Sequence, residues 1–521
     1  GTDRISMVEA AVRKDGTVLA MRVKMYENVG AYLRAPEPSC VMRSLTTFSG
    51  PYSIDNGEID VAAVMTSKLP TGLNRGYGGQ QHAFTVERMM DRVAEATGLD
   101  PVEVRRRNLI KAGELPRRMT TGSYYDSGDY AGCLDRVLAL ADYAALKREC
   151  ERLRNEGRMV GVGVATIIHS AASNIGYVTL ALPPEDRAKI GYRHKSGTSD
   201  AAQVSLDPSG RIRVQIATAG AGQGHATTAA QIVAGQFGLR TEDVLVQDRM
   251  DTGSSLWSIT SGTYASRFSV VTAGAIHKAA MALRARVLAV AGELLEVATD
   301  DLEISDGRVW LRAAPEKVLS LRQIAGAVYW DRGSFRTDAS VDLQATQSYA
   351  ARNLAPPDHQ DRVNAAATYG FMADVALVEI DPDTWIPKVL KYFAVHDVGR
   401  PLNPTLIRGQ IAGGIVHGMG GALYEELIYD DSGQMMNASF AEYLCPTAVE
   451  VPEMFIDHFD SPAPFNELGT KGCGENSAMS APAAIASAVE DALRQRKVHI
   501  DQLPATPGLI WRRVNESAAQ P

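Results

Sequence analysis

The chain has 521 residues, of which 45% are hydrophobic and 22% are charged, so it is long enough to build two or more hydrophobic cores. A formal net charge of -8 argues against nucleic acid or an anionic membrane surface as a partner. Apolar stretches such as residues 160–168 are too short to span a membrane, and residues 1–4 do not resemble a signal peptide.

The N-terminal part of the chain predicts strands followed by helices. We expect two strands within residues 5–33 around an Asp15-Gly16 turn, a strand at 59–65, a helix at 84–97, a short helix to 109 capped by Asp100, and a charged helix at 134–157. A new alternating pattern begins at Met159. We therefore predict two subdomains, residues 1–157 and residues 158–521.

The second region mixes strands and helices. We expect strands at 200–206, 211–217, 371–380 and 389–395, and helices at 226–237 and 270–297. This order does not follow a regular β-α-β alternation, so it predicts an α+β fold with mixed sheets and packed helices.

Residues 74–80 (NRGYGGQ) form a glycine-rich loop around an arginine. Gly76 and its neighbours permit close approach of a ligand, and the Arg75 guanidinium has several directed donors for an oxyanion or a metal-oxo group. The alternative is an arginine that caps a turn.

Residues 220–225 (GAGQGH) follow a predicted strand and open a helix, which is the context of a dinucleotide-binding loop. The third glycine is not in its required place, and Gln223 puts a large amide into the turn. We predict instead a loop for another phosphate-bearing, pterin-like ligand, held by Gly222, Gln223 and Gly224.

Residues 468–475 (LGTKGCGE) precede an Ala-rich helical run. The pattern places Glu475 at a helix entrance lined by Gly472 and Gly474, where helix amides favour oxyanions and polar cofactor atoms. Glu475 is our candidate catalytic base. The alternative is a glutamate that is favoured there only by the helix macrodipole.

The five cysteines, Cys40, Cys133, Cys150, Cys445 and Cys473, contain no C-x-x-C pair. This chain alone therefore holds no iron–sulfur cluster and no structural zinc. The small number of cysteines suits a reducing compartment, and we expect a cytoplasmic protein. If the chain does redox chemistry, its electrons must pass to a partner.

Together with residues 396–404 (HDVGRPLNP), these segments resemble the molybdenum-binding subunit of the xanthine dehydrogenase/aldehyde oxidase family of molybdenum hydroxylases. The resemblance covers residues 1–513. It implies xanthine-oxidase-type molybdenum-cofactor-binding domains and a molybdopterin cofactor in the cytosine dinucleotide form. The pterin dithiolene would hold the molybdenum, so no side chain is expected to ligate the metal. His396 and Asp397 are expected to be structural.

The resemblance also assigns residue roles. It implies that Tyr77 and Arg43 contact the substrate, and that Arg75, Gly76 and the Gln223 loop contact the cofactor. Tyr264 falls where relatives line the pocket, with Ala265 and Ser266 beside the cofactor, although a plain helix start capped by Ser261 or Thr263 is an equal reading. His417 stands where relatives often have a pterin-contacting glutamine, and it retains a hydrogen-bond donor.

The implied reaction is a hydroxylation. Glu475, kept ionised against burial by helix-entrance amides, would take a proton from a molybdenum-bound hydroxide. Water-derived oxygen would enter an electron-poor carbon of an aromatic N-heterocycle or aldehyde, and hydride would pass to Mo=S. Electrons would go to partner subunits with [2Fe-2S] clusters and FAD. A non-catalytic cofactor-binding or scaffold subunit and a reductase of aromatic thioesters are the alternatives.

Two departures from the family pattern carry further expectations. Gly76 stands where carbon monoxide dehydrogenases of this family have a copper-binding cysteine, so we do not expect a Mo–Cu enzyme. Full-length family subunits begin upstream of this sequence. We therefore expect a separate or cleaved N-terminal portion of the molybdenum subunit as an additional partner.

Overall fold

The computed structural model describes residues 3–190, 198–249, 251, 253, 256, 262–331, 333 and 342–518. The chain forms two compact units. The first comprises Gly1–His194, Asn353–Pro464 and Gly469–Pro521, and the second comprises Lys195–Arg352 and Phe465–Leu468. The boundary predicted after residue 157 falls inside the first unit, so the compact units follow a different division of the chain.

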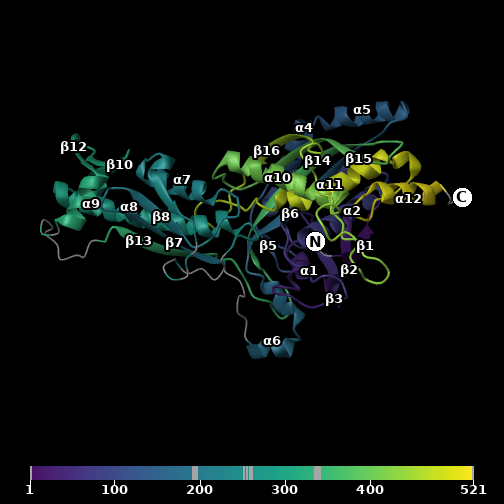
Figure 1. Ribbon diagram of the computed structural model, residues 1–521, viewed down its shortest axis with the longest axis horizontal. Coiled ribbons are helices and arrows are strands. Elements are labelled where there is room, and N and C mark those ends of the chain that lie inside the picture. The colour runs from purple at the N-terminus through teal and green to yellow at the C-terminus, as the bar shows by residue number, and fades with distance from the viewer. Residues whose placement is uncertain are drawn as a thin grey trace. The chain divides into compact units, whose positions relative to one another are not determined.

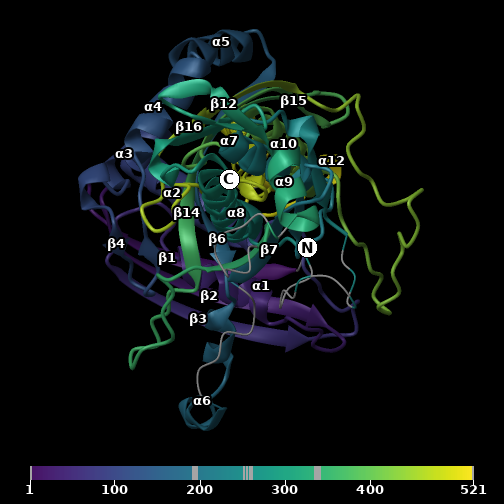
Figure 2. The same ribbon diagram turned by 90° about the vertical axis from the view of Figure 1, so that its left-hand side faces the viewer.

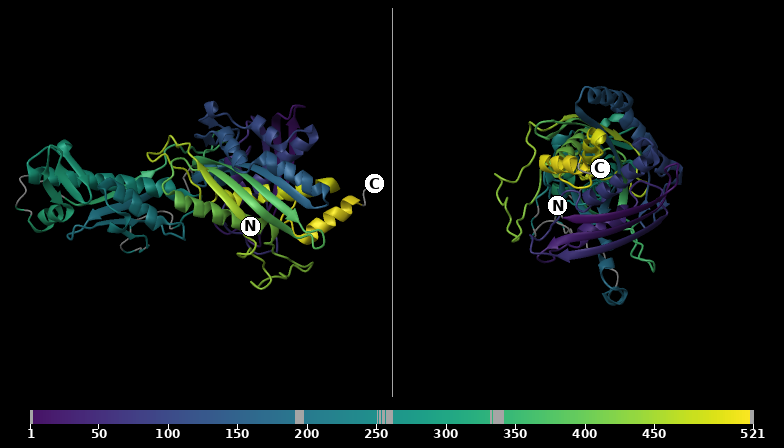
Figure 3. Two further views of the ribbon diagram at one scale, coloured as in Figure 1. Left: turned by 90° about the horizontal axis from the view of Figure 1, so that it is seen from above. Right: turned by 90° about the vertical axis from the view of Figure 1, so that its right-hand side faces the viewer.

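The main sheet of the first unit has four strands in the order β16-β15-β14-β6 (Figure 3). The strands are β6 (Met159–Ser173), β14 (Ala366–Ile380), β15 (Pro387–Asp397) and β16 (Glu453–Phe459). β14 is antiparallel to both β6 and β15, and β15 is parallel to β16. A sheet buried on both faces reads as nearly continuous apolar sequence, and every residue of β6 is buried.

Two smaller sheets complete the strands of the first unit. They contain β1 (Arg4–Val12), β2 (Val18–Gly30) and β3 (Asn56–Met65), which lie side by side in Figure 2, and the short pair β4 (Arg117–Arg118) and β5 (Tyr124–Tyr125). The predicted turn between β1 and β2 is present, with Gly16 at a φ of 83°.

The first unit also contains α-helices and 3-10 helices. They are α1 (Ser39–Met42), α2 (Gly79–Thr97), α3 (Pro101–Asn108), α4 (Tyr130–Leu140), α5 (Tyr143–Asn155), α6 (Pro184–Ile190), α10 (Pro404–Leu423), α11 (Asn476–Ala492) and α12 (Pro507–Ala518), with the 3-10 helices η1 (Arg43–Thr47) and η3 (Gly176–Ala181). Asp100 caps α3 as predicted, because its side chain accepts a hydrogen bond from the amide of Val102.

Glycines on β6 let helix α11 lie directly on the strand (Figure 1). A Cβ atom on Gly161 would lie 2.2 Å from the carbonyl oxygen of Ala488, and one on Gly163 would lie 2.2 Å from that of Ala484. Side chains alternate along a strand, so His169 belongs to the same face of β6 as these glycines. The strand therefore presents His169 to the N-terminal end of α11.

The second unit contains a four-stranded sheet in the order β13-β7-β8-β9 and a three-stranded sheet of β10, β11 and β12. Its elements are β7 (Ser199–Leu206), β8 (Ile212–Ile216), α7 (His225–Phe237), β9 (Val244–Gln247), α8 (Val271–Leu295), β10 (Leu302–Ser305), β11 (Arg308–Leu311), β12 (Ala314–Ser320), α9 (Leu321–Trp330) and β13 (Gln344–Ala350). Helix α8 packs on β7 and β13.

The prediction of one continuous charged helix was wrong. The charged segment 134–157 is not a single helix: α4 ends at Leu140 and α5 begins at Tyr143. Asp142 adopts a left-handed conformation with a φ of 42°, and its side chain accepts a hydrogen bond from the amide of Ala145. Asp is one of the few residues that tolerate this conformation and also cap a helix, so it turns the chain there.

The helices within the described ranges include none that is both long and apolar enough to cross a membrane.

Candidate active site

Glu475 occupies the N-cap position of α11, as the sequence predicts, and its side chain is buried. Its Oε2 atom accepts a hydrogen bond from Nη2 of Arg43 at 2.7 Å. The same oxygen lies 3.1 Å from Nε2 of His169 on β6. The first unit thus brings η1 and β6, which are distant in sequence from α11, to one carboxylate.

The surroundings of Glu475 keep it ionised. Burial alone would raise its pKa, but the positive charge of Arg43 and the hydrogen bond with His169 outweigh burial and lower the pKa from 4.5 to about 2. Glu475 is therefore a carboxylate at neutral pH. The sequence predicted this ionised state from helix amides, whereas the structure shows Arg43 and His169 as its main causes.

Arg43 lies in η1 and is 1% exposed. Besides Glu475, it donates to the backbone carbonyl oxygens of Tyr77 at 3.2 Å and Ser170 at 3.3 Å. Its guanidinium also lies over the Tyr77 ring, 4.4 Å from the centroid, and the Tyr77 hydroxyl lies 3.1 Å from that of Tyr177 in η3. Arg43 and Tyr77, which the sequence predicted as neighbours of one site, are in direct contact.

Arg75 links the glycine loop before α2 to the two helices α10 and α11. Its Nε donates to the carbonyl oxygen of Gly474, and its Nη2 donates to that of Gln410 at 2.8 Å. Gly76 beside it has a φ of 78°, and a Cβ there would lie 2.9 Å from Cγ of Met479. The backbone at position 76 is therefore suited to glycine and poorly suited to cysteine.

His396 and Asp397 each have a partner within the first unit. Nε2 of His396 lies 2.8 Å from Oδ1 of Asp374. The Lys471 ammonium donates to Oδ2 of Asp397 at 2.7 Å, and both side chains are almost fully buried. Lys471 directly precedes Gly472, so this ion pair anchors the glycine segment that leads to Glu475.

Six of the predicted site residues lie in the second unit: Gly222, Gln223, Gly224, Tyr264, Ala265 and Ser266. His225, the first residue of α7, connects the two predicted segments, because its ring stacks on Phe268 at 3.9 Å and its Nε2 lies 3.3 Å from the Thr263 hydroxyl. Gly222 has a φ of 97°, and a Cβ there would meet nothing within 4 Å. The cofactor and pocket roles of these six residues stay predictions.

His169 is a site residue that the sequence reasoning missed. It is fully buried on β6, and its Nδ1 lies 3.4 Å from the carbonyl oxygen of Gly472. A signal was present: within 159–173, small or apolar residues alternate along the α11 face, and His169 interrupts them as a polar residue. A histidine on an apolar strand face needs buried hydrogen-bond partners.

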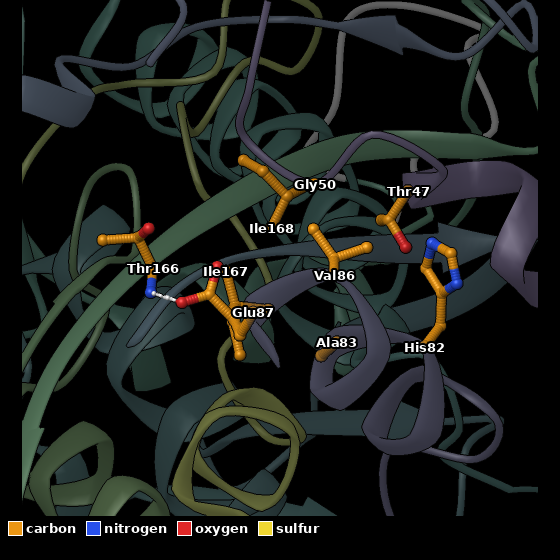
Figure 4. Close-up of a pocket in the computed structure, with 9 residues that line it drawn as sticks. All are labelled: Thr47, Gly50, His82, Ala83, Val86, Glu87, Thr166, Ile167 and Ile168. Atoms are coloured by element: carbon orange, nitrogen blue, oxygen red, sulfur yellow. Dashed lines mark hydrogen bonds between the residues drawn. The ribbon is translucent and has the colours of Figure 1, made fainter. Parts of the chain in front are cut away.

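A small cavity between α2 and β6 lies beside a different carboxylate. His82, Glu87 and Thr166 are among its lining residues, and Glu475 is not. Figure 4 shows the backbone amide of Thr166 donating to Glu87. This cavity lies within the first unit, and Glu475 lies elsewhere, at the start of α11.

Comparisons with known proteins identify the family. Two family models, each described as a molybdopterin cofactor-binding domain, match residues 1–109 and 136–452. The chain belongs to the molybdenum-binding subunits of the xanthine dehydrogenase/aldehyde oxidase family. This confirms the resemblance and the α+β class that the sequence predicted.

Relatives within this family align along nearly the whole chain. The large subunit of nicotine 6-hydroxylase from Paenarthrobacter nicotinovorans is 31% identical, over 97% of this chain and 59% of the relative. The solved structure of quinoline 2-oxidoreductase from Pseudomonas putida 86 has a TM-score of 0.85 and 32% identity, covering 98% of this chain and 62% of that chain. The carbon monoxide dehydrogenase large chain from Hydrogenophaga pseudoflava is 30% identical, over 98% of this chain and 60% of the relative. The chain thus spans about three fifths of their length.

The residues around Glu475 fit the molybdopterin cofactor of this family. The side-chain amide of Asn476 and the hydroxyl of Ser477, in the first turn of α11, are buried and have no hydrogen-bond partner within the described residues. Polar groups in that position, next to Arg75 and helix amides, suit a ligand rich in oxygen and nitrogen acceptors and donors. His417 on α10 is partly buried, and burial lowers its pKa, so the ring is a neutral donor and acceptor at neutral pH.

Proposed function

We propose that this chain is the catalytic molybdenum-binding part of a heteromeric oxidoreductase that inserts water-derived oxygen at an electron-poor carbon, with Glu475 as the base. One observation carries the proposal. Glu475 is a buried carboxylate at a glycine-bordered helix start, held ionised by Arg43 and His169. Burying a charge costs free energy unless the charge is paired and hydrogen-bonded. Buried groups with strongly shifted pKa values are concentrated at functional sites.

In this proposal, the first unit holds the cofactor through Arg75, Gly76, Gly472, Gly474 and His417. Molybdenum, when bound through the pterin dithiolene, supplies the two-electron redox chemistry and an acidic oxygen ligand. We further propose the cytosine dinucleotide form of the pterin, with iron–sulfur and FAD subunits as partners that receive the electrons. The names of relatives as large chains and as subunits of complexes support such partners.

The side chains act on the proton and on developing charge. Glu475 accepts the proton that the reaction releases, because it is ionised before substrate binds. Arg43 stabilises negative charge that develops beside Glu475. Tyr77 presents an aromatic ring next to Arg43, and the Tyr77–Tyr177 hydroxyl contact fixes its orientation.

An aromatic N-heterocycle is the substrate class that we favour over an aldehyde. Tyr77 suits a planar ring, since aromatic rings pack well against each other. Two relatives carry nicotine and quinoline in their names, and both align over almost the full length of this chain. The glycine-specific backbone at Gly76 argues against a copper-binding cysteine and hence against carbon monoxide as substrate.

The test uses the natively purified complex that contains this chain, with quinoline and nicotine as first probes in ¹⁸O-labelled water. We expect label in the product, near-stoichiometric molybdenum, and loss of turnover in the Glu475→Gln variant with molybdenum retained. Glu490→Gln is the matched control, because Glu490 is an ion-paired carboxylate at the other end of α11.

Each alternative predicts a different result. A non-catalytic scaffold would leave the turnover of the complex unchanged in Glu475→Gln. A reductase of aromatic thioesters would consume electrons and incorporate no label from water. Product without label, or full activity of Glu475→Gln, would contradict the proposed function.

A further inference from the structure

The sheet of β1, β2 and β3 changes character along its length. Toward one end, it carries exposed ion pairs between Arg22 and Glu9, between Arg22 and Glu58, and between Lys24 and Asp60. At the other end, where β2 and β3 finish, large apolar side chains are exposed. A single exposed apolar residue needs no explanation, but a contiguous group of them marks an interaction site or an aggregation hazard.

The exposed apolar side chains belong to two adjacent segments, residues 30–33 and 64–73, which we call the apolar patch. Hydrogen bonds join the segments, because the amide of Thr66 donates to the carbonyl oxygen of Gly30 and the amide of Ala31 donates to that of Lys68, both at 3.0 Å. The exposed fractions range from 40% to 61% for Tyr32, Leu33, Val64, Met65, Leu69 and Leu73. These side chains therefore form one surface and are not scattered singly.

A third segment extends the apolar patch. The Tyr429 hydroxyl accepts a hydrogen bond from the amide of Leu69 at 3.4 Å, and the Lys68 ammonium lies 5.1 Å from the centroid of the Tyr429 ring. Leu427 and Ile428, next to Tyr429, are also exposed. All three segments belong to the first unit, so this surface is a property of one compact unit.

The apolar patch carries little charge. Lys68 is the only charged residue within 64–73, and its ammonium donates to Oδ2 of Asp3 at 2.6 Å. Residues 30–33 contain no charged side chain. Permanent interfaces are more hydrophobic than transient ones and resemble a domain core cut in half. The patch therefore suits a permanent neighbour.

The edge of the sheet at β3 supports the same conclusion. The order β1-β2-β3 makes β3 an edge strand of the sheet that the described residues form. Proteins commonly protect exposed edges with charged side chains. Glu58 and Asp60 lie in the first half of β3, whereas residues 61–65 carry no charge and the last three of them are exposed. A neighbour that covers the second half of the strand removes this hazard.

We propose that the apolar patch is the docking surface for the remaining part of the molybdenum subunit. The relatives compared above continue for about two fifths of their length beyond the part that this chain matches. In those relatives the additional sequence belongs to the same chain, so it is a permanent neighbour of the kind that an uncharged surface requires. The patch also lies within residues 1–109, which match a molybdopterin cofactor-binding domain.

Docking at the apolar patch places the neighbour close to the Arg75 loop. Leu73 is two residues before Arg75 in sequence. Arg4 on β1 connects the sheet to this loop, because it donates to the carbonyl oxygen of Gly78 at 3.1 Å and forms a buried ion pair with Glu27 on β2. A neighbour that holds the sheet therefore also restricts the loop. The inference does not depend on the chemistry proposed for Glu475.

The experiment places a photo-crosslinking amino acid at position 65 or 69 of this chain in the natively purified complex, with position 58 on β3 as the control. Peptide mass spectrometry identifies the sequence that is joined. We expect crosslinks from positions 65 and 69 to sequence that aligns with the additional part of the relatives, whether that sequence is a separate polypeptide or continuous with this chain. Position 58, in the charged half of the strand, should give none.

Three outcomes would overturn the inference. The first is crosslinking of positions 65 and 69 to a second copy of this chain, or to an iron–sulfur or FAD subunit. The second is the absence of any crosslink from both positions. The third is equal crosslinking from position 58, because the neighbour would then not recognise the apolar patch.

A pair of charge substitutions gives a second readout. Met65→Glu combined with Leu69→Glu places unpaired carboxylates in the proposed interface, so the hydrogen-exchange protection of residues 66–73 in the complex should fall at least about tenfold. Val12→Glu is the control, because Val12 is an exposed apolar residue of β1 that pairs with Val18 at the other end of the sheet. Unchanged protection in the double variant would show that the patch faces solvent. Neither measurement needs turnover, so failure of this inference and failure of the proposed function are distinguishable.

Discussion

The first unit contains two buried glutamates that face the same strand and serve different purposes. Glu87 on α2 accepts from the backbone amide of Thr166 and from Nε of Arg105, both at 2.9 Å, and from the Tyr52 hydroxyl. Glu475 at the start of α11 meets Arg43 and His169. Each carboxylate thus has one arginine partner and one contact with β6.

The two glutamates differ in their surroundings. Burial raises the pKa of Glu87, although Arg105 and hydrogen bonds oppose it, whereas the pKa of Glu475 is lowered to about 2. Glu87 is enclosed by core side chains, while glycines and a helix N-terminus border Glu475. A buried glutamate–arginine pair alone therefore does not indicate a catalytic site. The glycine-bordered backbone that would let a ligand approach is what distinguishes Glu475 from Glu87.

Removing the charge of Glu87 gives the largest expected loss of stability. Glu87→Gln breaks a buried ion pair, so the free energy of unfolding should fall by about 3–5 kcal/mol. Arg105 keeps Asp91 at 2.9 Å, which limits the loss. Thermal unfolding of the complex measures the effect, and kcat per molybdenum should stay at the wild-type value. If Glu87→Gln lowered kcat per molybdenum as much as Glu475→Gln does, the functional distinction between the two glutamates would be wrong.

The pH dependence of stability should show the contribution of Glu475. Its pKa is lowered in the folded state, so its stabilisation is fully present above about pH 4.5 and is lost as the pH falls toward 2. A shift of this size corresponds to about 3 kcal/mol. Denaturation of wild type and Glu475→Gln between pH 6 and 3 should show a smaller acid loss in the variant. Parallel curves would refute the ion-pair account.

Exchanging the two arginines for lysine sharpens the comparison further. Arg43→Lys keeps the charge but loses the planar group that donates to Tyr77, Ser170 and Glu475 together, so kcat/KM should fall about tenfold, or about 1.4 kcal/mol. Arg105→Lys should reduce stability and leave kcat/KM of the folded complex unchanged. Steady-state kinetics at matched molybdenum contents measures both variants. A loss of kcat/KM in Arg105→Lys but not in Arg43→Lys would contradict the prediction.

The smallest predicted effect concerns the glycine border. Gly76→Ala places a Cβ at a φ of 78° and 2.9 Å from Met479, which should cost about 1 kcal/mol or more. Gly421→Ala is the control, because a Cβ at that position in α10 meets nothing within 4 Å and should raise stability by about 0.5–1 kcal/mol. Chemical denaturation distinguishes the two. A stabilising Gly76→Ala would show that the loop does not need glycine.

Much of the fold was predictable because local signals were strong. The strand pairs, the Asp100 cap and the helix after Glu475 follow from alternation, turn residues and capping. The break at Asp142 was not predicted, since both flanking segments have helical composition and only the backbone conformation of one residue separates them. Helix propensity does not determine where one helix ends and the next begins.

The candidate site was only partly predictable. Glu475, Arg75 and Tyr77 lie in glycine-rich segments that a sequence displays openly. His169 lies 306 positions from Glu475, and only the packing of α11 on Gly161 and Gly163 brings them together. The ion pair between Arg43 and Glu475 likewise depends on tertiary structure. Sequence identified the loops of the site, and packing supplied the groups that set the charge of its base.

Anaerobic reduction of the molybdenum by substrate, followed in a single turnover, tests the catalytic role of Glu475 most directly. The Glu475→Gln complex should contain the same molybdenum per chain as wild type and be reduced about 10²–10⁴ times more slowly. Reduction at the wild-type rate, with molybdenum in place, would contradict the assignment of Glu475 as the base.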